Sequence, residues 1–184
     1  KATETKFMTF LLENNFLGNK TGKGFYQKTD QKDQNGRTIV NAFDLKTLEY
    51  KPSVRPKNPI LKEAKAIEKM QKRMPFLMGK EGKESLFLKD YLTAIFAYAA
   101  QRVPEISDQY YPVDDAMRAG YVWDFGPFEY WDLIGFQNGI DLIEAAGEKI
   151  PHWVKQMQNA GAEHFYKYEK GQKKYFDLDS QGYK

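Results

Sequence analysis

The residues with the clearest potential for chemistry are a carboxylate pair and two histidines in the second half of the chain. Glu129 and Asp132 are three residues apart, which places them on one face of a helix. Paired carboxylates can divide the roles of general acid and general base. The simpler alternative, which we prefer, is that Glu129 offsets the positive end of a short helix. His152 and His164 have no nucleophile near them in sequence, so no catalytic residue is assigned.

A glycine-rich segment, Gly18 to Gly24, could approach an anionic ligand closely. It is not a P-loop, because three residues rather than the required four separate its first glycine from its Gly-Lys pair. It also fails as a dinucleotide fingerprint, since Gln27 occupies the place of the third glycine. The simplest interpretation is a turn that reverses the backbone. The alternative is that Lys20 and Lys23 bind an anion, and these two lysines are the predicted substrate-binding residues.

Composition excludes several other kinds of site. The chain has 184 residues, 41% of them apolar and 29% charged, which is typical of a globular protein. The absence of cysteine excludes a disulfide scaffold, a thiolate zinc site and a cysteine nucleophile. The longest apolar run, residues 92–100, is far shorter than the roughly 20 residues that span a bilayer. We therefore predict no membrane span, no metal and a cytoplasmic protein. Because the first residue is Lys1, we expect a piece of a longer chain.

Charge is distributed unevenly along the sequence. Residues 1–83 contain 18 basic and 9 acidic side chains, whereas residues 84–184 contain 10 and 16. A basic half can form a surface for a polyanion, but a solvated, lysine-rich linker is the simpler explanation. The lysines are scattered and no nucleic-acid-binding motif is present, so no nucleic-acid partner is predicted.

The first 59 residues are predicted to form a helix, a hairpin and a linker. Apolar residues at helical spacing predict a helix over 4–17, with Gly18 as its cap. A polar turn is expected over 27–36, followed by a return strand over 37–45. Three prolines within 51–59 predict an extended linker.

The middle of the chain is predicted to contain two helices. One begins after Pro59 and runs to about Arg73, where Pro75 and Gly79 end it. The other covers 84–103 and stops at Pro104. This second helix has two apolar stripes, one through Leu92, Phe96 and Val103 and one through Phe87, Tyr91 and Tyr98. Two such stripes predict a central helix that is buried on both sides.

Shorter helices and a hairpin are predicted for the remainder. The helices cover 108–120, 127–134, 136–146 and 151–161, and each is bounded by glycine or proline. Alternating aromatic residues over 164–168 and 174–178 predict a β-hairpin. The aromatic cluster Tyr121, Trp123, Phe125, Phe128, Tyr130 and Trp131 is predicted to be core. The alternative is an aromatic-lined pocket for an acyl chain.

The sequence also contains an internal repeat. In the first copy a helix is followed by Gly24-Phe-Tyr and then by Phe43-Asp-Leu. In the second copy a later helix is followed by His164-Phe-Tyr and then by Phe176-Asp-Leu. Chance similarity in an aromatic-rich chain is the alternative. The repeat predicts that residues 1–50 are the end of a first domain copy, 51–59 a linker and 60–184 a second copy. The predicted fold class is mainly α with short β-hairpins after the helices.

Two motifs resemble the 3-hydroxyacyl-CoA dehydrogenase family. Residues 17–26, Leu-Gly-Asn-Lys-Thr-Gly-Lys-Gly-Phe-Tyr, resemble the end of its helical C-terminal domain. Residues 114–120 and 125–135 resemble a helix pair of the same domain. The repeat is similar to the tandem C-terminal region of a long bacterial type, in which the dehydrogenase precedes an enoyl-CoA hydratase-like region. In that family an asparagine near the start of the long helix positions the substrate. Glu84 and Ser85 occupy the corresponding place, so no catalytic residue is transferred.

The resemblance implies an enzyme of fatty-acid β-oxidation that uses NAD, bound by a Rossmann domain absent from these residues. This chain would then close the acyl-CoA site, pack against that Rossmann domain and form a homodimer. It would be inactive by itself. The alternative hypothesis is a non-catalytic α-helical binding or assembly module.

Overall fold

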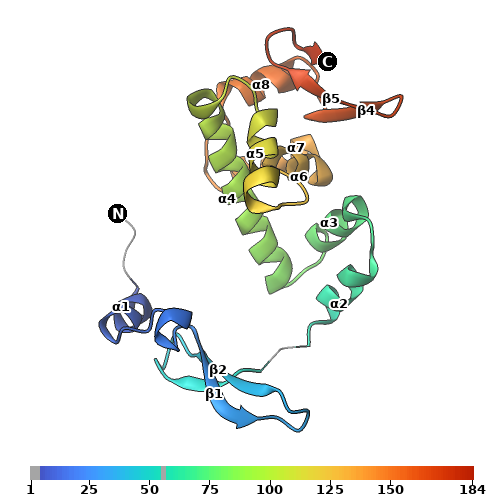
Figure 1. Cartoon of the computed structure of the whole chain (residues 1–184). Coiled ribbons are helices and arrows are strands. Elements are labelled where there is room, and N and C mark those ends of the chain that lie inside the picture. The colour runs from blue at the N-terminus through green and yellow to red at the C-terminus, as the bar shows by residue number, and fades with distance from the viewer. Residues whose placement is uncertain (1–4, 55–56) are drawn as a thin grey trace. The chain divides into compact units, whose positions relative to one another are not determined.

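The computed structural model describes residues 5–54 and 57–184, which form two compact units (Figure 1). Unit 1 extends to Lys57 and unit 2 begins at Asn58. Helices dominate, and each unit ends in a small antiparallel sheet. The predicted fold class, mainly α with short hairpins, is therefore confirmed.

Unit 1 is a short helix followed by a three-stranded sheet. Its elements are α1 (Lys6–Glu13), the 3-10 helix η1 (Asn19–Thr21), β1 (Tyr26–Lys32), β2 (Thr38–Phe43) and β3 (Tyr50–Pro52), with sheet order β1-β2-β3. The polar turn predicted over 27–36 is wrong in extent, because most of it is strand β1. Backbone pairing with β2 compensates for the lack of apolar residues there. The turn itself is short, and the Asp33 carboxylate closes it by accepting from the Asn35 and Arg37 amides.

Two predictions at the ends of unit 1 are also wrong. Gly18 does not cap the first helix, since α1 ends at Glu13. Asn15 takes the left-handed conformation at φ 55°, and the Phe16 amide donates to the Leu11 carbonyl at 2.8 Å. The predicted linker begins later than expected, because β3 includes Pro52. Residues 55–56 of that linker lie outside the described part of the chain.

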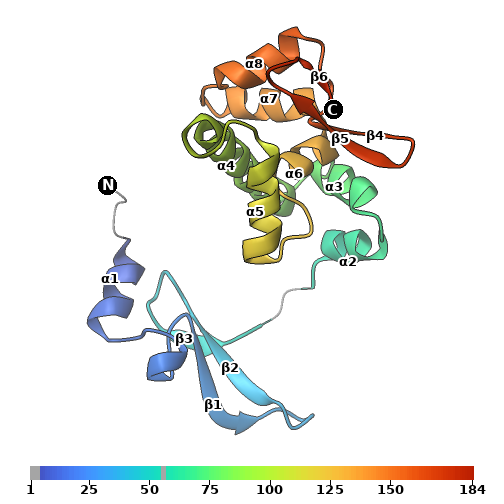
Figure 2. The ribbon, with the colours of Figure 1, turned by 45° about the horizontal axis from the view of Figure 1, so that its top comes forward.

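Unit 2 contains a helical layer and a C-terminal sheet (Figure 2). Its elements are α2 (Pro59–Ala66), α3 (Met70–Met78), α4 (Lys83–Ile106), α5 (Tyr111–Tyr121), α6 (Pro127–Ile134), α7 (Phe136–Ala145), α8 (His152–Asn159), β4 (Tyr166–Glu169), β5 (Gln172–Asp177) and β6 (Gly182–Tyr183). The predictions for α6, α7, α8 and the β4–β5 hairpin are confirmed. Strand β6, which pairs with β5, was not predicted.

The core of unit 2 forms where α4, α6 and α7 meet. Trp131 is fully buried and its ring stacks on Phe96, with the ring centroids 5.1 Å apart. Its indole Nε1 donates to the Phe136 carbonyl at 2.8 Å. A Cβ on Gly139 would lie 1.9 Å from that nitrogen, so only glycine leaves room for the ring. The prediction that this aromatic cluster supplies core is confirmed for Trp131 and Phe128 but is wrong for Tyr121, which is 71% exposed at the end of α5.

The helix predicted from Pro59 to Arg73 is in fact two helices. The chain leaves helical geometry at Ile67, whose carbonyl accepts from the Arg73 side chain at 2.8 Å. Pro75 does not end the second helix, because it lies inside α3. Gly79 follows the last residue of α3, as predicted.

Pro104 does not end the long helix either. Helix α4 continues to Ile106, although proline has no N–H to donate to the carbonyl four residues earlier. That carbonyl, of Ala100, instead accepts from Trp153 Nε1 of α8 at 2.9 Å. A tertiary contact thus replaces the missing helical bond.

One face of α4 is exposed, contrary to prediction. The stripe with Phe96 is buried, but Phe87 and Tyr98 are each 69% exposed. Periodicity identified both apolar stripes, but within the described part of unit 2 the neighbouring elements cover the stripe with Phe96 and leave much of the other exposed. The helix predicted to end at Gly120 includes that glycine and ends at Tyr121. Within the described residues, no helix combines the length and hydropathy needed to cross a bilayer.

Candidate functional site

The glycine-rich segment of unit 1 folds as a closed turn. The Gly18 amide donates to the Lys23 carbonyl at 2.9 Å, so the two ends of the turn are bonded. The Thr21 hydroxyl fixes the interior, since it accepts from the Leu17 amide at 2.9 Å. A Cβ on Gly24 would lie 2.7 Å from Gly18 Cα, which explains the glycine there. The interpretation of this segment as a backbone turn is confirmed.

This turn is an insertion relative to the matching part of unit 2. In both units the helix is followed by a hairpin in which equivalent phenylalanines bond. The Phe43 amide donates to the Phe25 carbonyl and the Phe176 amide to the Phe165 carbonyl, each at 2.9 Å. Eight residues separate Phe16 from Phe25, but two separate Ala162 from Phe165. The six-residue turn 18–23 is therefore unnecessary for making the hairpin.

The two predicted lysines lie in that turn with different surroundings. Lys20 is exposed in the middle of η1. Lys23 is partly buried, with its ammonium 4.2 Å from the ring centroid of Phe16, a cation–π contact. Lys20 is therefore the more accessible of the two cations.

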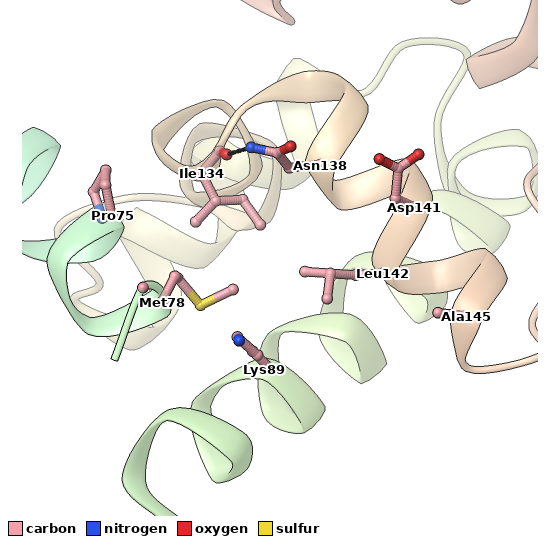
Figure 3. A pocket seen from close by; sticks show the side chains of 9 residues that line it. Pro75, Met78, Lys89, Ile134, Asn138, Asp141, Leu142 and Ala145 are labelled. Carbon is pink, nitrogen blue, oxygen red and sulfur yellow. Dashed lines mark hydrogen bonds between the residues drawn. The ribbon is translucent and has the colours of Figure 1, made fainter. Parts of the chain in front are cut away.

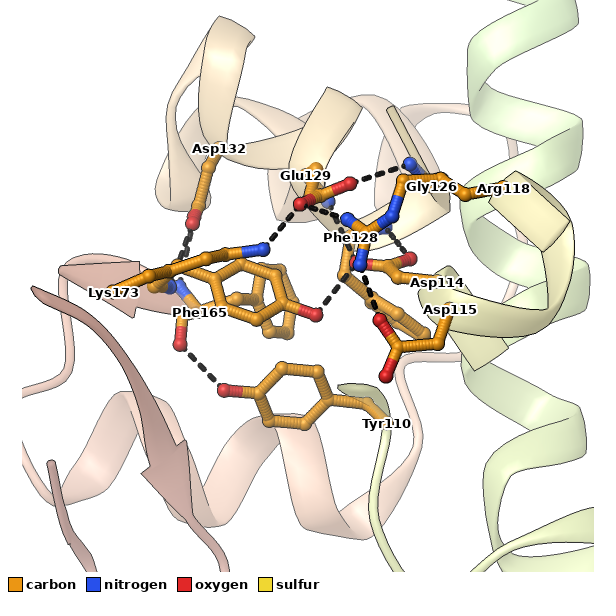
Figure 4. Close-up of polar contacts among 11 residues, drawn as sticks. Tyr110, Asp114, Asp115, Arg118, Gly126, Phe128, Glu129, Asp132, Phe165 and Lys173 are labelled. Carbon is orange, nitrogen blue, oxygen red and sulfur yellow. Dashed lines mark hydrogen bonds and ion pairs between the residues drawn. The ribbon is translucent and has the colours of Figure 1, made fainter. Parts of the chain in front are cut away.

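The polar network of unit 2 centres on buried carboxylates (Figure 4). Asp114 of α5 is fully buried and accepts from the Phe128 and Glu129 amides, at 2.9 and 3.1 Å. It thus caps the N-terminus of α6 rather than its own helix. A Cβ on Gly126 would lie 2.3 Å from the Asp114 carboxylate, so the approach of α5 requires glycine at this position.

Asp132 holds the C-terminal hairpin against α6. Its two carboxylate oxygens accept from the Phe165 and Tyr166 amides, each at 2.8 Å. The Tyr166 hydroxyl in turn donates to Asp114 at 2.7 Å. Burial raises the pKa of Asp114 and of Asp132 to about 7, against the lowering effect of these hydrogen bonds.

Glu129 is part of an ion-pair cluster. It accepts from the Gly126 amide at 2.8 Å and pairs with Arg118 and Lys173. Although burial acts to raise its pKa, the bonds from Lys173, Gly126 and Arg118 lower it overall. Glu129 therefore serves the start of α6, as the preferred interpretation states. These carboxylates are used for folding, and the geometry assigns no acid–base pair.

An open crevice of about 550 Å³ lies between α3, α4, α6 and α7 (Figure 3). Met78, Ile134 and Leu142 form its apolar wall. Lys89 and Asp141 line it as well, so its two charged side chains have opposite sign. Charge alone does not select an anionic or a cationic ligand here.

The residues at the position that matches the family's asparagine make contacts that stabilise the fold. Glu84 accepts from the Asn58 side-chain amide at 2.5 Å, and Ser85 is buried with its hydroxyl 3.3 Å from the Met78 carbonyl. Both residues fix the start of α4. Across the described residues, no cluster of acidic or histidine side chains is arranged to hold a metal ion.

Relatives of known name align with most of the chain. A protein of Bacillus subtilis (strain 168) named "Probable 3-hydroxyacyl-CoA dehydrogenase" is 34% identical over 171 residues, 93% of this chain and 21% of its own length. A protein of Rickettsia prowazekii (strain Madrid E) named "Putative fatty acid oxidation complex trifunctional enzyme" is 27% identical over 77% of this chain and 18% of its own.

The chain thus spans about a fifth of the length of these curated relatives. No protein-family profile matches it, and no solved structure does. The similarity covers both units, with the glycine turn and the α5–α6 pair that carry the motifs. The resemblance of this chain to the 3-hydroxyacyl-CoA dehydrogenases is therefore confirmed.

Proposed function

We propose that this chain is the C-terminal helical region of an NAD-dependent 3-hydroxyacyl-CoA dehydrogenase of fatty-acid β-oxidation. In that enzyme it closes the acyl-CoA site against a Rossmann domain, which binds NAD, and contributes to a homodimer. Units 1 and 2 are the end of one domain copy and most of a second. The proposal also places the protein in the cytoplasm.

The inserted turn of unit 1 is the observation that supports a role at the substrate. Unit 2 makes the same hairpin contacts without an equivalent of residues 18–23, so the hairpin itself does not require this turn. The turn presents Lys20 to solvent on a backbone with Gly18 and Gly22 at positive φ. Coenzyme A carries phosphates, and a lysine ammonium binds a phosphate as a point charge. We infer that the turn contacts the CoA portion of the substrate.

Replacing Lys20 and Lys23 together by glutamine in the full-length enzyme tests this role. The KM for acyl-CoA is expected to rise about threefold to tenfold at low salt with little change in kcat, as for lost uniform binding. The increase should shrink at high salt, because exposed charges are screened. Steady-state kinetics at two ionic strengths measure both effects.

A matched control removes the same charge from the same hairpin outside the turn. Lys28 and Lys32 are exposed on β1, so Lys28→Gln with Lys32→Gln should leave KM unchanged. Equal KM values for parent enzyme and the turn variant at both ionic strengths would exclude the phosphate contact. An absence of any dehydrogenase activity in the full-length protein would instead favour the assembly-module alternative.

A further inference from the structure

A second cavity of unit 2 has a more uniform lining than the crevice beside Lys89. It is an apolar groove of about 380 Å³ between α3, the first half of α4 and the segment that joins α5 to α6. Met70 and Met74 of α3 line it together with Leu88 and Ile95 of α4. This volume lies within the range of small-molecule sites, roughly 300–1,000 Å³.

The lining of the groove suits an uncharged, flexible ligand. Asp124 is its one charged lining residue among those that the structure describes. Methionine side chains are unbranched and polarizable, so they adapt to a chain without fixed shape. Trp123 and Tyr130 add aromatic surface from the α5–α6 side. Of the aromatic cluster in the sequence, these two line a cavity, whereas Phe128 and Trp131 are sealed in the core.

The rim of the groove has the strain and exposure of a binding site. Val122 lines the groove, is 88% exposed and has φ 56°. A β-branched residue rarely adopts this left-handed conformation, and such strain concentrates at functional sites. Tyr91, also at the rim, stacks on the exposed Phe87 with ring centroids 6.0 Å apart. Apolar surface thus continues from the groove onto the outside of α4.

We propose that this groove binds the hydrocarbon tail of a fatty acyl thioester, in the domain copy that lacks the family's asparagine. The inference rests on the proposed function for the identity of the ligand. It assigns the second copy a part in substrate length selection, distinct from the reaction itself.

Charge complementarity places the ligand's polar head outside the groove, on the side of α3. Residues 59–83, which include α2 and α3, hold seven basic and three acidic side chains, a formal charge of +4. The segment from residue 84 onward is acidic by six charges. The apolar wall that α3 contributes therefore borders the basic part of unit 2, where the phosphates of a CoA thioester would be favoured.

Filling the groove tests the proposal. Ile95→Trp adds volume at a partly buried lining residue of α4. In the full-length enzyme, this change should raise KM for a 16-carbon 3-hydroxyacyl-CoA by about tenfold or more, since a misfitted methylene alone can cost that factor. KM for the four-carbon substrate, which is too short to fill the groove, should stay within about twofold. Ala94→Trp, one residue away on the exposed face of α4, should change neither value.

Direct binding separates this proposal from the proposed function. Titration of palmitoyl-CoA and of CoA alone, without NAD, should show that Ile95→Trp weakens the first and not the second. If the protein has no dehydrogenase activity but palmitoyl-CoA binding depends on Ile95, the groove assignment stands and the proposed function fails. If activity is normal and both substrates respond equally to Ile95→Trp, the groove assignment is wrong. A change in sedimentation of Ile95→Trp without a chain-length effect would also overturn it, in favour of a subunit interface.

Discussion

The sheets that end unit 1 and unit 2 share their internal contacts but differ in what surrounds them. The Tyr50 hydroxyl donates to the Gly24 carbonyl at 2.5 Å, and the Tyr183 hydroxyl donates to the His164 carbonyl at 2.7 Å. These carbonyls belong to equivalent residues, each preceding the Phe-Tyr pair. In both units the last strand therefore bonds back to the start of the hairpin.

An ion pair is repeated in the same way. Lys51 pairs with Asp44 and Lys184 pairs with Asp177, each at 2.7 Å. The bond from Lys51 lowers the pKa of Asp44, and the bond from Lys184 lowers that of Asp177 to about 2. Each aspartate belongs to a Phe-Asp-Leu segment of the repeat.

The difference lies in how each sheet is held in its unit. In unit 1 aromatic rings do this, and Phe43 stacks on Phe10 of α1 with centroids 5.7 Å apart. In unit 2 the ring of Trp131 supports the hairpin as well, but the carboxylates of Asp114 and Asp132, which come from helices, also bind β4 directly. The same internal contacts of the sheet therefore occur with two different sets of contacts to the rest of the unit.

The largest effect is expected from removing the aromatic support beneath the unit 2 hairpin. Trp131 contacts Phe165 with ring centroids 5.1 Å apart. Trp131→Ala should lower the free energy of unfolding of unit 2 by about 3–5 kcal/mol, the cost of truncating a buried large aromatic. Urea denaturation of the 184-residue chain, followed by fluorescence of the remaining tryptophans, measures it. All three tryptophans belong to unit 2.

Unit 1 provides the internal control for that change. Its amide hydrogen exchange should be the same in Trp131→Ala and the parent chain, because the two units have separate cores. Tyr168→Ala, at a side chain that is 73% exposed, should leave the urea midpoint in place. Coincident midpoints for Trp131→Ala and the parent would contradict the burial of this ring.

An intermediate effect is expected from pH, and it should distinguish the two units. A carboxyl group whose pKa is higher in the folded than in the unfolded state stabilises the fold at pH values below its unfolded-state pKa. This contribution is lost as the pH rises toward its folded-state pKa. For Asp114 and Asp132 that window is about pH 4 to 7. Unit 2 should therefore lose on the order of 2 kcal/mol between pH 5 and 7. Asp44 of unit 1 is shifted the other way and keeps its contribution there.

Asp132→Asn should roughly halve the slope of the unfolding free energy of unit 2 with pH, in addition to lowering that free energy. Asp141→Asn is the control, because Asp141 is exposed on α7 and should leave the slope intact. Urea midpoints at pH 5, 6 and 7 measure the slope. A parent chain whose unit 2 gains stability over this range would show that both carboxylates are ionised when buried.

The smallest effect concerns the repeated tyrosine contact. Tyr50→Phe and Tyr183→Phe each remove one hydroxyl that donates to a backbone carbonyl, so each should cost about 1 kcal/mol. The comparison predicts that the two losses are equal, each confined to its own unit. Hydrogen exchange of β2 and β5 measures them separately. A loss of stability in one unit only would mean that the two tyrosine hydrogen bonds, although alike in geometry, contribute unequally to stability.

Local signals in the sequence were sufficient for some elements of this fold. Gly126-Pro127 and Gly135 bound α6 as predicted, because a proline in the first turn and a glycine at positive φ act within a few residues. Pro75 and Pro104 misled for the opposite reason. Each lies inside a helix, and for Pro104 the compensating donor, Trp153, is 53 residues from Ala100.

The candidate site was less predictable than the fold. The glycine turn was recognised from its composition, but only the matched hairpin of unit 2 identifies it as an insertion. The partners of Asp114, Phe128 and Tyr166, are 14 and 52 residues away along the chain, and nothing local in the sequence reveals them. Periodicity likewise could not tell which stripe of α4 is covered, because a pattern of apolar residues does not identify the neighbouring element.

The proline near the end of α4 has a consequence for the order in which the chain assembles. The Ala100 carbonyl has no helical donor at Pro104 and instead accepts from the indole of Trp153. During synthesis α4 leaves the ribosome well before α8, and until α8 docks that carbonyl must remain hydrated. The last turn of α4 should therefore reach its final hydrogen bonding only after α8 has formed and packed against it.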